Sequence, residues 1–363
     1  TGEVVVVGGV RRSALISLSN LSDQRIRSAK TGDWWTTNPE RALANNSVAY
    51  TEKPDPGIFM KEWLSLYESK SGERGIFSRA SAQAKAAENG RRDASWEFGT
   101  NPCSEIILRP NQFCNLTEVV VRSTDTVASL TRKIQIATLL GTIQSTFTNF
   151  GYLRKRWQNN TEEERLLGVS LTGIMDSPLM NGKESGLEKR LETLRGVAVE
   201  DNKYWAEKFG INQSTAITCV KPSGTVSQLV DSSSGIHARH NPYYIRTVRG
   251  DNKDPLTEFM KESGIPSEPD YMKPEHTTVF SFPMKAPTGS VCRNDMSAIE
   301  QLELWKLYAK HWCEHKPSVT ISVKESEWVP VGAWCWENFE YLSGVSFLPF
   351  SDHTYQQAPY QDI

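Results

Sequence analysis

The chain has 363 residues, which at about 100–200 residues per domain suits two ordinary domains or one large α/β barrel. Hydrophobic residues make up 38% and charged residues 23% of it, a composition typical of a globular protein with a sizeable core. The 41 basic and 43 acidic residues nearly cancel. This balance excludes a general polyanion-binding protein, so we expect no nucleic-acid partner.

Membrane and secretory classes are also disfavoured. No apolar run approaches the roughly 18–20 residues that a membrane span needs, so we expect no membrane partner. The first residues, Thr1-Gly-Glu-Val-Val-Val-Val, lack the layout of a signal peptide and are typical of a strand interior, which predicts a fragment that begins inside a domain. The six cysteines form no CxxC pair, which favours a reducing, cytoplasmic location.

Predicted strands and helices alternate along the chain. Apolar and β-branched runs predict strands at residues 3–7, 13–18, 105–108, 115–121, 166–172, 216–220, 277–282, 318–323 and 345–348. Helical spacing predicts helices at residues 59–67, about 126–150, 187–209, 299–312 and 331–341. The polar stretches 23–55 and 71–101 are expected to be irregular. This alternation predicts an α/β fold with a mostly parallel sheet or barrel, in one domain.

The densest chemical signal is Asn101-Pro-Cys103-Ser-Glu105, with Cys114 close behind it. In an extended segment alternate side chains face one side, so Asn101, Cys103 and Glu105 would surround one substrate with an amide, a thiol and a carboxyl group. A short connection between two strands would bring Cys114 back beside Cys103. This set suits redox chemistry with a carboxylate for proton transfer. The alternative is a buried core cysteine flanked by turn residues.

The same residues carry a family resemblance. Asn-Pro-Cys-x-Glu-Ile with Cys-Asn-Leu behind it resembles the catalytic-cysteine region of ribonucleotide reductases. Within that family the chain resembles most the monomeric, adenosylcobalamin-dependent (class II) ribonucleoside-triphosphate reductases. Seven blocks occur in the family's order: Gly8-Gly-Val-Arg-Arg-Ser-Ala, Gly72-Glu-Arg-Gly-Ile-Phe, Asn101-Pro-Cys-Ser-Glu, Gly168-Val-Ser-Leu-Thr-Gly-Ile-Met-Asp, Lys221-Pro-Ser-Gly-Thr-Val-Ser, Ser233-Ser-Gly-Ile-His and Asp352-His-Thr-Tyr-Gln-Gln-Ala-Pro-Tyr.

The resemblance implies catalytic roles for individual residues. Cys103 would become the thiyl radical that abstracts the ribose 3′-hydrogen, and Glu105 would take the 3′-hydroxyl proton. Asn101 would hold the ribose hydroxyls, and Ser104 would bind substrate beside it. Cys114 matches one half of the dithiol that reduces the 2′-position, and the family's partner cysteine lies upstream of this chain.

Lys221-Pro-Ser-Gly-Thr225 predicts an anion cradle, because a strand that runs into a Pro/Gly turn and a helix start presents backbone N–H groups and hydroxyls. It matches the family's loop for the substrate phosphates, so Pro222, Ser223, Gly224 and Thr225 are the expected contacts. The alternative is an ordinary strand-to-helix turn. The segment is not a Walker sequence, which argues against phosphoryl transfer.

The segment 7–13 resembles the family's specificity loop, which relays the identity of an allosteric deoxynucleotide effector to the substrate base. Gly8 and Gly9 would let this loop change shape, and Arg11 or Arg12 would pair with a phosphate or a base. The alternative is a strand bulge with exposed arginines.

The resemblance also implies the architecture and the partners. The fold would be the ten-stranded α/β barrel with a central finger loop, of which only the middle and later part is present in residues 1–363. Within it, residues 1–20 would hold the specificity loop, 101–122 the catalytic finger loop and 219–235 the phosphate loop. The cofactor would be adenosylcobalamin, bordered by residues from 255 to about 323, and a thioredoxin-like protein would be the reductant. The family's C-terminal cysteine pair would lie beyond Ile363, so we expect these residues alone to be inactive.

Several other features are interpreted as structural. The pair Tyr243-Tyr244 is expected to pack in the core. The residues His311, Cys313 and His315 suggest metal ligands by type, but a helix end with polar residues is the favoured interpretation, and no protein metal site is predicted. Two further histidines, His237 and His240, lie near the phosphate loop and are weak candidates for substrate contact.

Two other functions remain open from the sequence. One is a class I large subunit that acts on diphosphates, although the late tyrosine doublet of that class is not seen. The other is a nucleotide-binding or regulatory remnant in which Cys103 is inert.

Overall fold

The computed structural model describes residues 14–224, 226–271, 273–350 and 357–363, and it is a mixed α/β structure, as predicted. One five-stranded sheet has the order β1-β2-β3-β13-β12. Its strands are β1 (Leu15–Ser19), β2 (Ala44–Tyr50), β3 (Gly75–Ser78), β13 (Ser343–Pro349) and β12 (Val319–Val323). The first three strands are parallel to one another, β13 and β12 are parallel to each other, and β13 meets β3 in the antiparallel sense.

A second sheet of parallel strands continues the first. It has the order β6-β7-β8, with β6 (Asn115–Val120), β7 (Leu167–Thr172) and β8 (Thr218–Cys219). A parallel bridge between Val220 and Pro317 links the end of β8 to the residues just before β12. The described strands therefore follow one another from β1 round to β6, as in part of a barrel.

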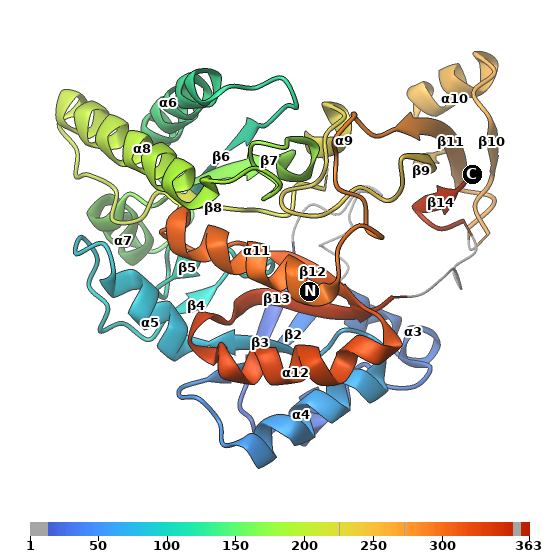
Figure 1. Cartoon of the computed structure of the whole chain (residues 1–363), viewed down its shortest axis with the longest axis horizontal. Helices are drawn as coiled ribbons and strands as arrows, with labels where there is room; N and C mark the ends of the chain where they lie inside the picture. Colours follow the sequence, from blue (N-terminus) through green and yellow to red (C-terminus); the bar gives the residue numbers. More distant parts are fainter. Residues whose placement is uncertain (1–13, 225, 272, 351–356) are drawn as a thin grey trace.

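Helices cover the outside of this curved sheet (Figure 1). Two pairs lie side by side, α4 with α12 and α6 with α8, and α11 packs against α8 and β12. Their bounds are α4 (Pro56–Ser69), α12 (Trp328–Glu337), α6 (Val127–Gln144), α8 (Leu187–Phe209) and α11 (Ala298–His311). Helix α8 ends at Gly210, whose φ of 64° is the left-handed conformation expected of a C-terminal glycine.

A smaller antiparallel sheet forms a separate lobe on the right of Figure 1. Its order is β10-β11-β9-β14, and helix α10 (Pro255–Glu262) lies beside it. The strands are β9 (Tyr243–Asp251), β10 (Ser267–Pro269), β11 (Thr277–Lys285) and β14 (Tyr360–Asp362). Of these strands, the sequence predicted only part of β11.

The two stretches expected to be irregular contain regular structure. Residues 23–55 include the buried strand β2, and residues 71–101 include β3 and helix α5 (Arg79–Ala87). Strand β2 was missed because its buried positions include the polar residues Asn46 and Ser47, which do not read as an apolar run. The helix predicted at about 126–150 ends earlier, at Gln144, and is followed by turns.

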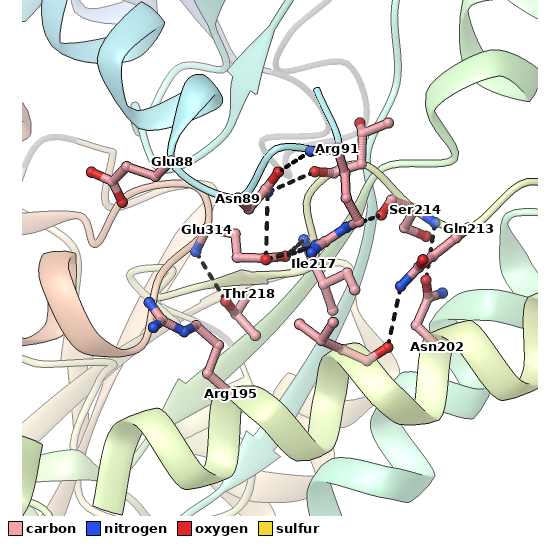
Figure 2. A network of polar contacts seen from close by, with 12 residues as sticks. Glu88, Asn89, Arg91, Arg195, Asn202, Gln213, Ser214, Ile217, Thr218 and Glu314 are labelled. Carbon is pink, nitrogen blue, oxygen red and sulfur yellow. Dashed lines mark hydrogen bonds and ion pairs between the residues drawn. The ribbon is translucent and has the colours of Figure 1, made fainter. Parts of the chain in front are cut away.

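A polar network ties β8 to the segment after α5 (Figure 2). Glu314 accepts two hydrogen bonds from Arg91, at 2.6 and 2.7 Å, and its Oε2 accepts a third from the backbone N–H of Ile217 at 3.0 Å. Arg91 Nε also donates to Ser214 O at 3.3 Å. The buried carboxylate thus fixes the start of β8, the strand that leads into Lys221.

Candidate active site

The segment from Asn101 to Ile106 forms a tight turn between two short antiparallel strands, β4 (Gly99–Thr100) and β5 (Ile107–Leu108). Ser104 N donates to Asn101 O at 2.9 Å, and Ser104 has a φ of 62°. The Asn101 side chain accepts a hydrogen bond from Ile106 N at 3.0 Å. The prediction of an extended segment with alternate side chains on one side is therefore wrong, because the backbone reverses at Ser104.

Neighbouring strands hold this turn from outside. Asn45, on β2, donates its side-chain N–H to Pro102 O at 2.7 Å. Gly344, on β13, has a φ of 76°, and a Cβ at this position would lie 3.0 Å from Ser104 O and 2.9 Å from Pro317 O. Only glycine fits this close approach without strain. The turn is thus held between β2 and β13.

Glu105 follows the turn and points into the protein. Its side chain is fully buried, and its Oε1 lies 3.3 Å from Lys221 Nζ. Burial lowers the pKa of Lys221, but the negative charge of Glu105 and the nearby Cys103 outweigh this, so the pKa is raised above its usual value. Lys221 therefore carries a full positive charge at neutral pH.

Two thiols lie around this charged pair. Cys103 is half-buried and is close enough to Lys221 to affect its pKa. Cys114 is near Glu105, and its pKa is raised, first by burial and second by the Glu105 charge. Near neutral pH Cys114 is therefore a neutral thiol. The structure thus brings Cys103, Glu105 and Cys114 into one electrostatic neighbourhood.

Cys103 lies on the wall of a cavity of about 260 Å³. Polar residues of β2, β12 and β13 and the loop residue Pro222 contribute to the same wall, among them Asn45, Asn46, Ser47, Thr320 and Ser346. Pockets for drug-sized ligands have volumes of about 300–1,000 Å³. This cavity therefore suits a sugar-sized group with several hydroxyls, next to a thiol.

The predicted phosphate loop follows β8. Lys221 N donates to Ser170 Oγ at 2.8 Å, and the Ser223 hydroxyl donates to Glu118 Oε2 at 2.8 Å while accepting from Ser227 N at 3.1 Å. Helix α9 (Val226–Leu229), which comes next, has only four residues. So short a helix has little macrodipole, and any anion affinity here would come mainly from backbone N–H groups, hydroxyls and Lys221.

Two sets of expected site residues lie outside the part of the chain that the structure describes. They are the phosphate-loop residue Thr225 and the specificity-loop residues Gly8, Gly9, Arg11 and Arg12. These remain predictions from the sequence.

A second cavity, of about 440 Å³, also borders the phosphate loop, and Pro222 lies on the walls of both cavities. Both histidines considered as substrate contacts line it. His237 uses both ring nitrogens within the protein, with Ser234 O at 2.9 Å and Thr320 N at 3.0 Å. His240 pairs with Asp362 at 2.9 Å. These contacts favour structural roles for both.

The tyrosine pair divides between core and surface. Tyr244 is buried and accepts a hydrogen bond from Arg239 at 3.1 Å, whereas Tyr243 is 57% exposed. Core packing is therefore confirmed for Tyr244 and wrong for Tyr243, because neighbours on a strand face opposite sides.

The three residues with metal-ligand side chains near α11 lie in different surroundings. His311 pairs with Glu192 on the surface, Cys313 is buried, and His315 lies between Ile107 N at 3.3 Å and Leu167 O at 3.0 Å. Within the described residues no three Cys, His, Asp or Glu side chains group as metal ligands. In the same residues, no helix combines the length and apolar character of a membrane span.

Sequence reasoning missed two site residues. Lys221 was treated only as the start of the phosphate loop, and Glu118 was not considered. Glu118 is on strand β6, and Cys114 immediately precedes that strand, four residues earlier. The alternation of extended side chains was a signal that the two face the same side. No local pattern indicated the pairing of Lys221 with Glu105, which are 116 residues apart.

Comparison with known proteins gives a consistent picture. No protein-family model matches the sequence. The chain is 28% identical over 396 residues to the adenosylcobalamin-dependent ribonucleoside-triphosphate reductase of Lacticaseibacillus paracasei, and 28% identical over 375 residues to that of Euglena gracilis. All of this chain is covered in both alignments, together with 52% and 49% of those proteins. The chain therefore spans about half the length of these curated relatives.

Solved structures agree with this similarity. A crystal structure of a B12-dependent (class II) ribonucleotide reductase superimposes on the whole chain with a TM-score of 0.78 and 25% identity, over 53% of that protein. The class Id ribonucleotide reductase alpha subunit of Actinobacillus ureae matches 96% of this chain and 73% of its own, with a TM-score of 0.63 and 14% identity. The second likeness concerns the fold alone. The fold is therefore the α/β barrel of the first of these structures, over the part that the chain covers.

Proposed function

We propose that the protein to which this chain belongs reduces ribonucleoside triphosphates to 2′-deoxyribonucleoside triphosphates by a thiyl-radical mechanism. The observation that carries the proposal is the shared neighbourhood of Cys103, Glu105 and the phosphate loop. Cys103 and Pro222 line one cavity, and Lys221, in the same loop as Pro222, pairs with Glu105. The similarity to named ribonucleoside-triphosphate reductases over the whole chain supports the same activity.

Each residue then has a defined task. Cys103 removes the 3′-hydrogen atom of the ribose, and Glu105 takes the 3′-hydroxyl proton as general base. Asn101 and Ser104 hold the substrate at the turn, while Pro222, Ser223, Gly224 and Thr225 hold its phosphates. The 2′-hydroxyl leaves as water, and Cys114 with a second thiol supplies the two electrons and becomes a disulfide.

The residues around Cys103 fit a cofactor that generates a radical. Cys103 is half-buried on a cavity wall, so its sulfur can be reached without moving the turn. Adenosylcobalamin, when bound, would supply the radical that Cys103 receives. The segment from 255 to about 323 would border it. The chain's own contribution is to hold Cys103 at a fixed place, keep Glu105 away from water and retain the substrate.

The remaining assignments complete the proposal. Residues 1–363 form one partial catalytic barrel unit, in which 1–20 include the specificity loop, 101–122 the catalytic loop and 219–235 the phosphate loop. A deoxynucleotide effector acts through Gly8, Gly9, Arg11 and Arg12. A thioredoxin-like protein regenerates the dithiol, in the cytoplasm.

The test is a cofactor-dependent reductase assay on the purified full-length protein. CTP or CDP would be incubated with a dithiol and adenosylcobalamin, and the deoxynucleotide product would be quantified. We expect product from CTP that is lost without the cofactor and lost in Cys103→Ala. Product only from CDP, or only after addition of a separate radical-generating subunit, would contradict the proposal. A folded protein that binds nucleotide without making product would favour a regulatory role.

A further inference from the structure

Glu105 and Lys221 form an ion pair whose two ends lie in different surroundings. Their charged atoms are 3.3 Å apart; the Glu105 side chain is fully buried, whereas that of Lys221 is 35% exposed. A buried carboxylate without a cation favours its neutral form, because the protein interior solvates charge poorly. The ammonium of Lys221 therefore stabilises the charged form of Glu105 at a place where burial opposes it.

The ion pair uses only one carboxylate oxygen. Glu105 Oε1 faces Lys221, whereas Glu105 Oε2 is buried and makes no hydrogen bond to the described residues. A buried acceptor without a donor is unfavourable in the protein alone. An oxygen of this kind is suited to accept a hydrogen bond or a proton from a bound hydroxyl.

Other ionisable groups lie around the pair. Cys114, just before β6, and Cys219, on β8, have thiols with raised pKa values, because of burial first and the Glu105 charge second. Glu118, on β6, is the second carboxylate near Lys221, and its pKa is raised, mainly by burial. The thiol of Cys103, in the turn, is a further neighbour of Lys221, and the positive charge of Arg92 partly offsets the raised pKa of Cys114.

The position of Lys221 in the chain connects two parts of the site. Its backbone N–H is fixed to Ser170 on β7, and a Cβ on Gly235 would meet Lys221 O, so the start of the phosphate loop is held in place. From this fixed backbone the side chain crosses to Glu105, beside the catalytic turn.

We propose that Lys221 is a positioning residue, which keeps Glu105 as a carboxylate and leaves Oε2 as the oxygen that accepts the substrate proton. The inference rests on the proposed function, in which Glu105 is the general base. In this role Lys221 changes the protonation of Glu105. A phosphate ligand would instead change the affinity for the nucleotide.

The direct test measures the protonation of Glu105 without turnover. Infrared difference spectra at pH 7 would compare the wild-type full-length protein with Lys221→Met. We expect a protonated-carboxyl C=O band to appear in Lys221→Met and to vanish in Lys221→Met/Glu105→Gln. Lys221→Arg keeps the positive charge and should show no band. Absence of the band in Lys221→Met would overturn the proposal.

Helix α6 offers a control variant, in which a lysine of similar exposure with a carboxylate partner is replaced. The Lys133 side chain is 37% exposed and pairs at 2.6 Å with that of Asp125, which is 7% exposed, away from the site, so Lys133→Met removes a similar ion pair. It should leave the reductase rate and its pH profile unchanged. Thermal unfolding of each variant would show that the comparison concerns folded protein.

The kinetic test separates positioning from phosphate binding. In Lys221→Met the acid limb of kcat/KM should move about one unit or more to higher pH, because a nearby opposite charge shifts a carboxyl group by about 1–3 units. Lys221→Arg should restore the wild-type limb. A raised KM with an unchanged pH profile would assign Lys221 to the phosphates and contradict the proposal. If the wild-type protein makes no deoxynucleotide, the proposed function fails, while the infrared result still tests the pairing.

Discussion

Ser223 donates a hydrogen bond of 2.8 Å to Glu118, so a carboxylate lies directly beside the loop proposed to hold the substrate phosphates. Burial raises the pKa of Glu118, although the Ser223 hydrogen bond and the charge of Lys221 oppose this. The second oxygen, Oε1, is buried and makes no hydrogen bond to the described residues. A negative charge here repels phosphate, whereas the neutral acid does not.

Nucleotide binding should therefore weaken as the pH rises through the raised pKa of Glu118. Glu118→Gln should bind a ribonucleoside triphosphate about fivefold more tightly at pH 8, since a unit charge at about 4 Å in water is worth about 1 kcal/mol. Calorimetry from pH 5 to pH 8 would give the Kd of the wild type and of the variant. The titration of the phosphate groups affects both values equally, so it cancels in their ratio. A ratio that stays constant over this range would count against the idea. Glu163→Gln, which changes an exposed carboxylate, is the control.

Gly344 supports a second prediction, because its position combines a left-handed backbone with a close approach to the catalytic turn. In Gly344→Ala the new methyl group would meet Ser104 O and Pro317 O, both backbone atoms that cannot rotate away. We expect the turn to shift, and a displacement of about 1 Å at a reacting group can lower the rate about 100-fold.

Gly186→Ala is the matched control for this change. Gly186 has a φ of 79°, close to the 76° of Gly344, but a Cβ there has no neighbour within 4 Å. Gly186→Ala should lower the unfolding free energy by about 1–2 kcal/mol, because alanine is strained in the left-handed conformation. It should leave kcat unchanged. Equal losses of kcat in the two variants would remove the special role of Gly344.

The sequence predicted well the features that depend on local patterns. Helix α8 and its end at Gly210, and strand β7 with its six buried residues, follow from apolar periodicity and a glycine C-cap. The family resemblance pointed to Cys103, Glu105 and Cys114, and the structure brings these residues together, although their roles stay predictions.

Features that depend on distant partners were not predictable in this way. Strand β2 is polar by sequence because its Asn45 supports the turn at Pro102, 57 residues away. The reversal at Ser104 depends on a left-handed φ that serine seldom adopts and that the surrounding strands stabilise. The pairing of Glu105 with Lys221 depends on β8 lying beside the turn, which no alternation of polar and apolar residues encodes.

Lys316 gives a third prediction, on the pH dependence of stability. It is buried, donates to Ser81 Oγ at 2.6 Å, and its pKa is lowered to about 7, because of burial first and the charge of Lys85 second. The unfolded chain keeps the usual lysine pKa of about 10.4, so between these values the unfolded state binds more protons. This group therefore contributes stability at high pH that is lost as the pH falls towards 7.

Denaturant unfolding of the wild type and Lys316→Met at pH 7.5, 8.5 and 9.5 would measure this contribution. The difference in unfolding free energy, wild type minus variant, should rise by up to about 1.4 kcal/mol per pH unit. Comparison with the variant cancels the titration of the other groups, including the buried thiols. A difference that is flat with pH would mean that Lys316 stays charged when folded.

The fourth prediction concerns the ion pair of Glu314 and Arg91 (Figure 2). Glu314 is 6% exposed and accepts hydrogen bonds from Arg91 and from Ile217 N, whereas Arg91 is 24% exposed. Breaking a buried pair leaves an uncompensated polar group and costs about 3–5 kcal/mol. Glu314→Gln should therefore lower the unfolding free energy by about this amount and loosen β8, the strand that leads into Lys221.

The pair of Arg79 and Glu97 is the exposed counterpart, since Glu97 is 75% exposed. Glu97→Gln should cost less than about 1 kcal/mol.

A double-mutant cycle with Arg91→Met isolates the interaction itself. Because the two side chains share the network, their coupling energy should be about 1–3 kcal/mol, and the double variant should be more stable than the sum of the two single losses implies. Loss of reductase activity in Glu314→Gln should appear in kcat, because a looser β8 moves Lys221 away from Glu105. A coupling energy near zero, or a cost for Glu314→Gln no greater than for Glu97→Gln, would show that the network in Figure 2 does not brace the strand.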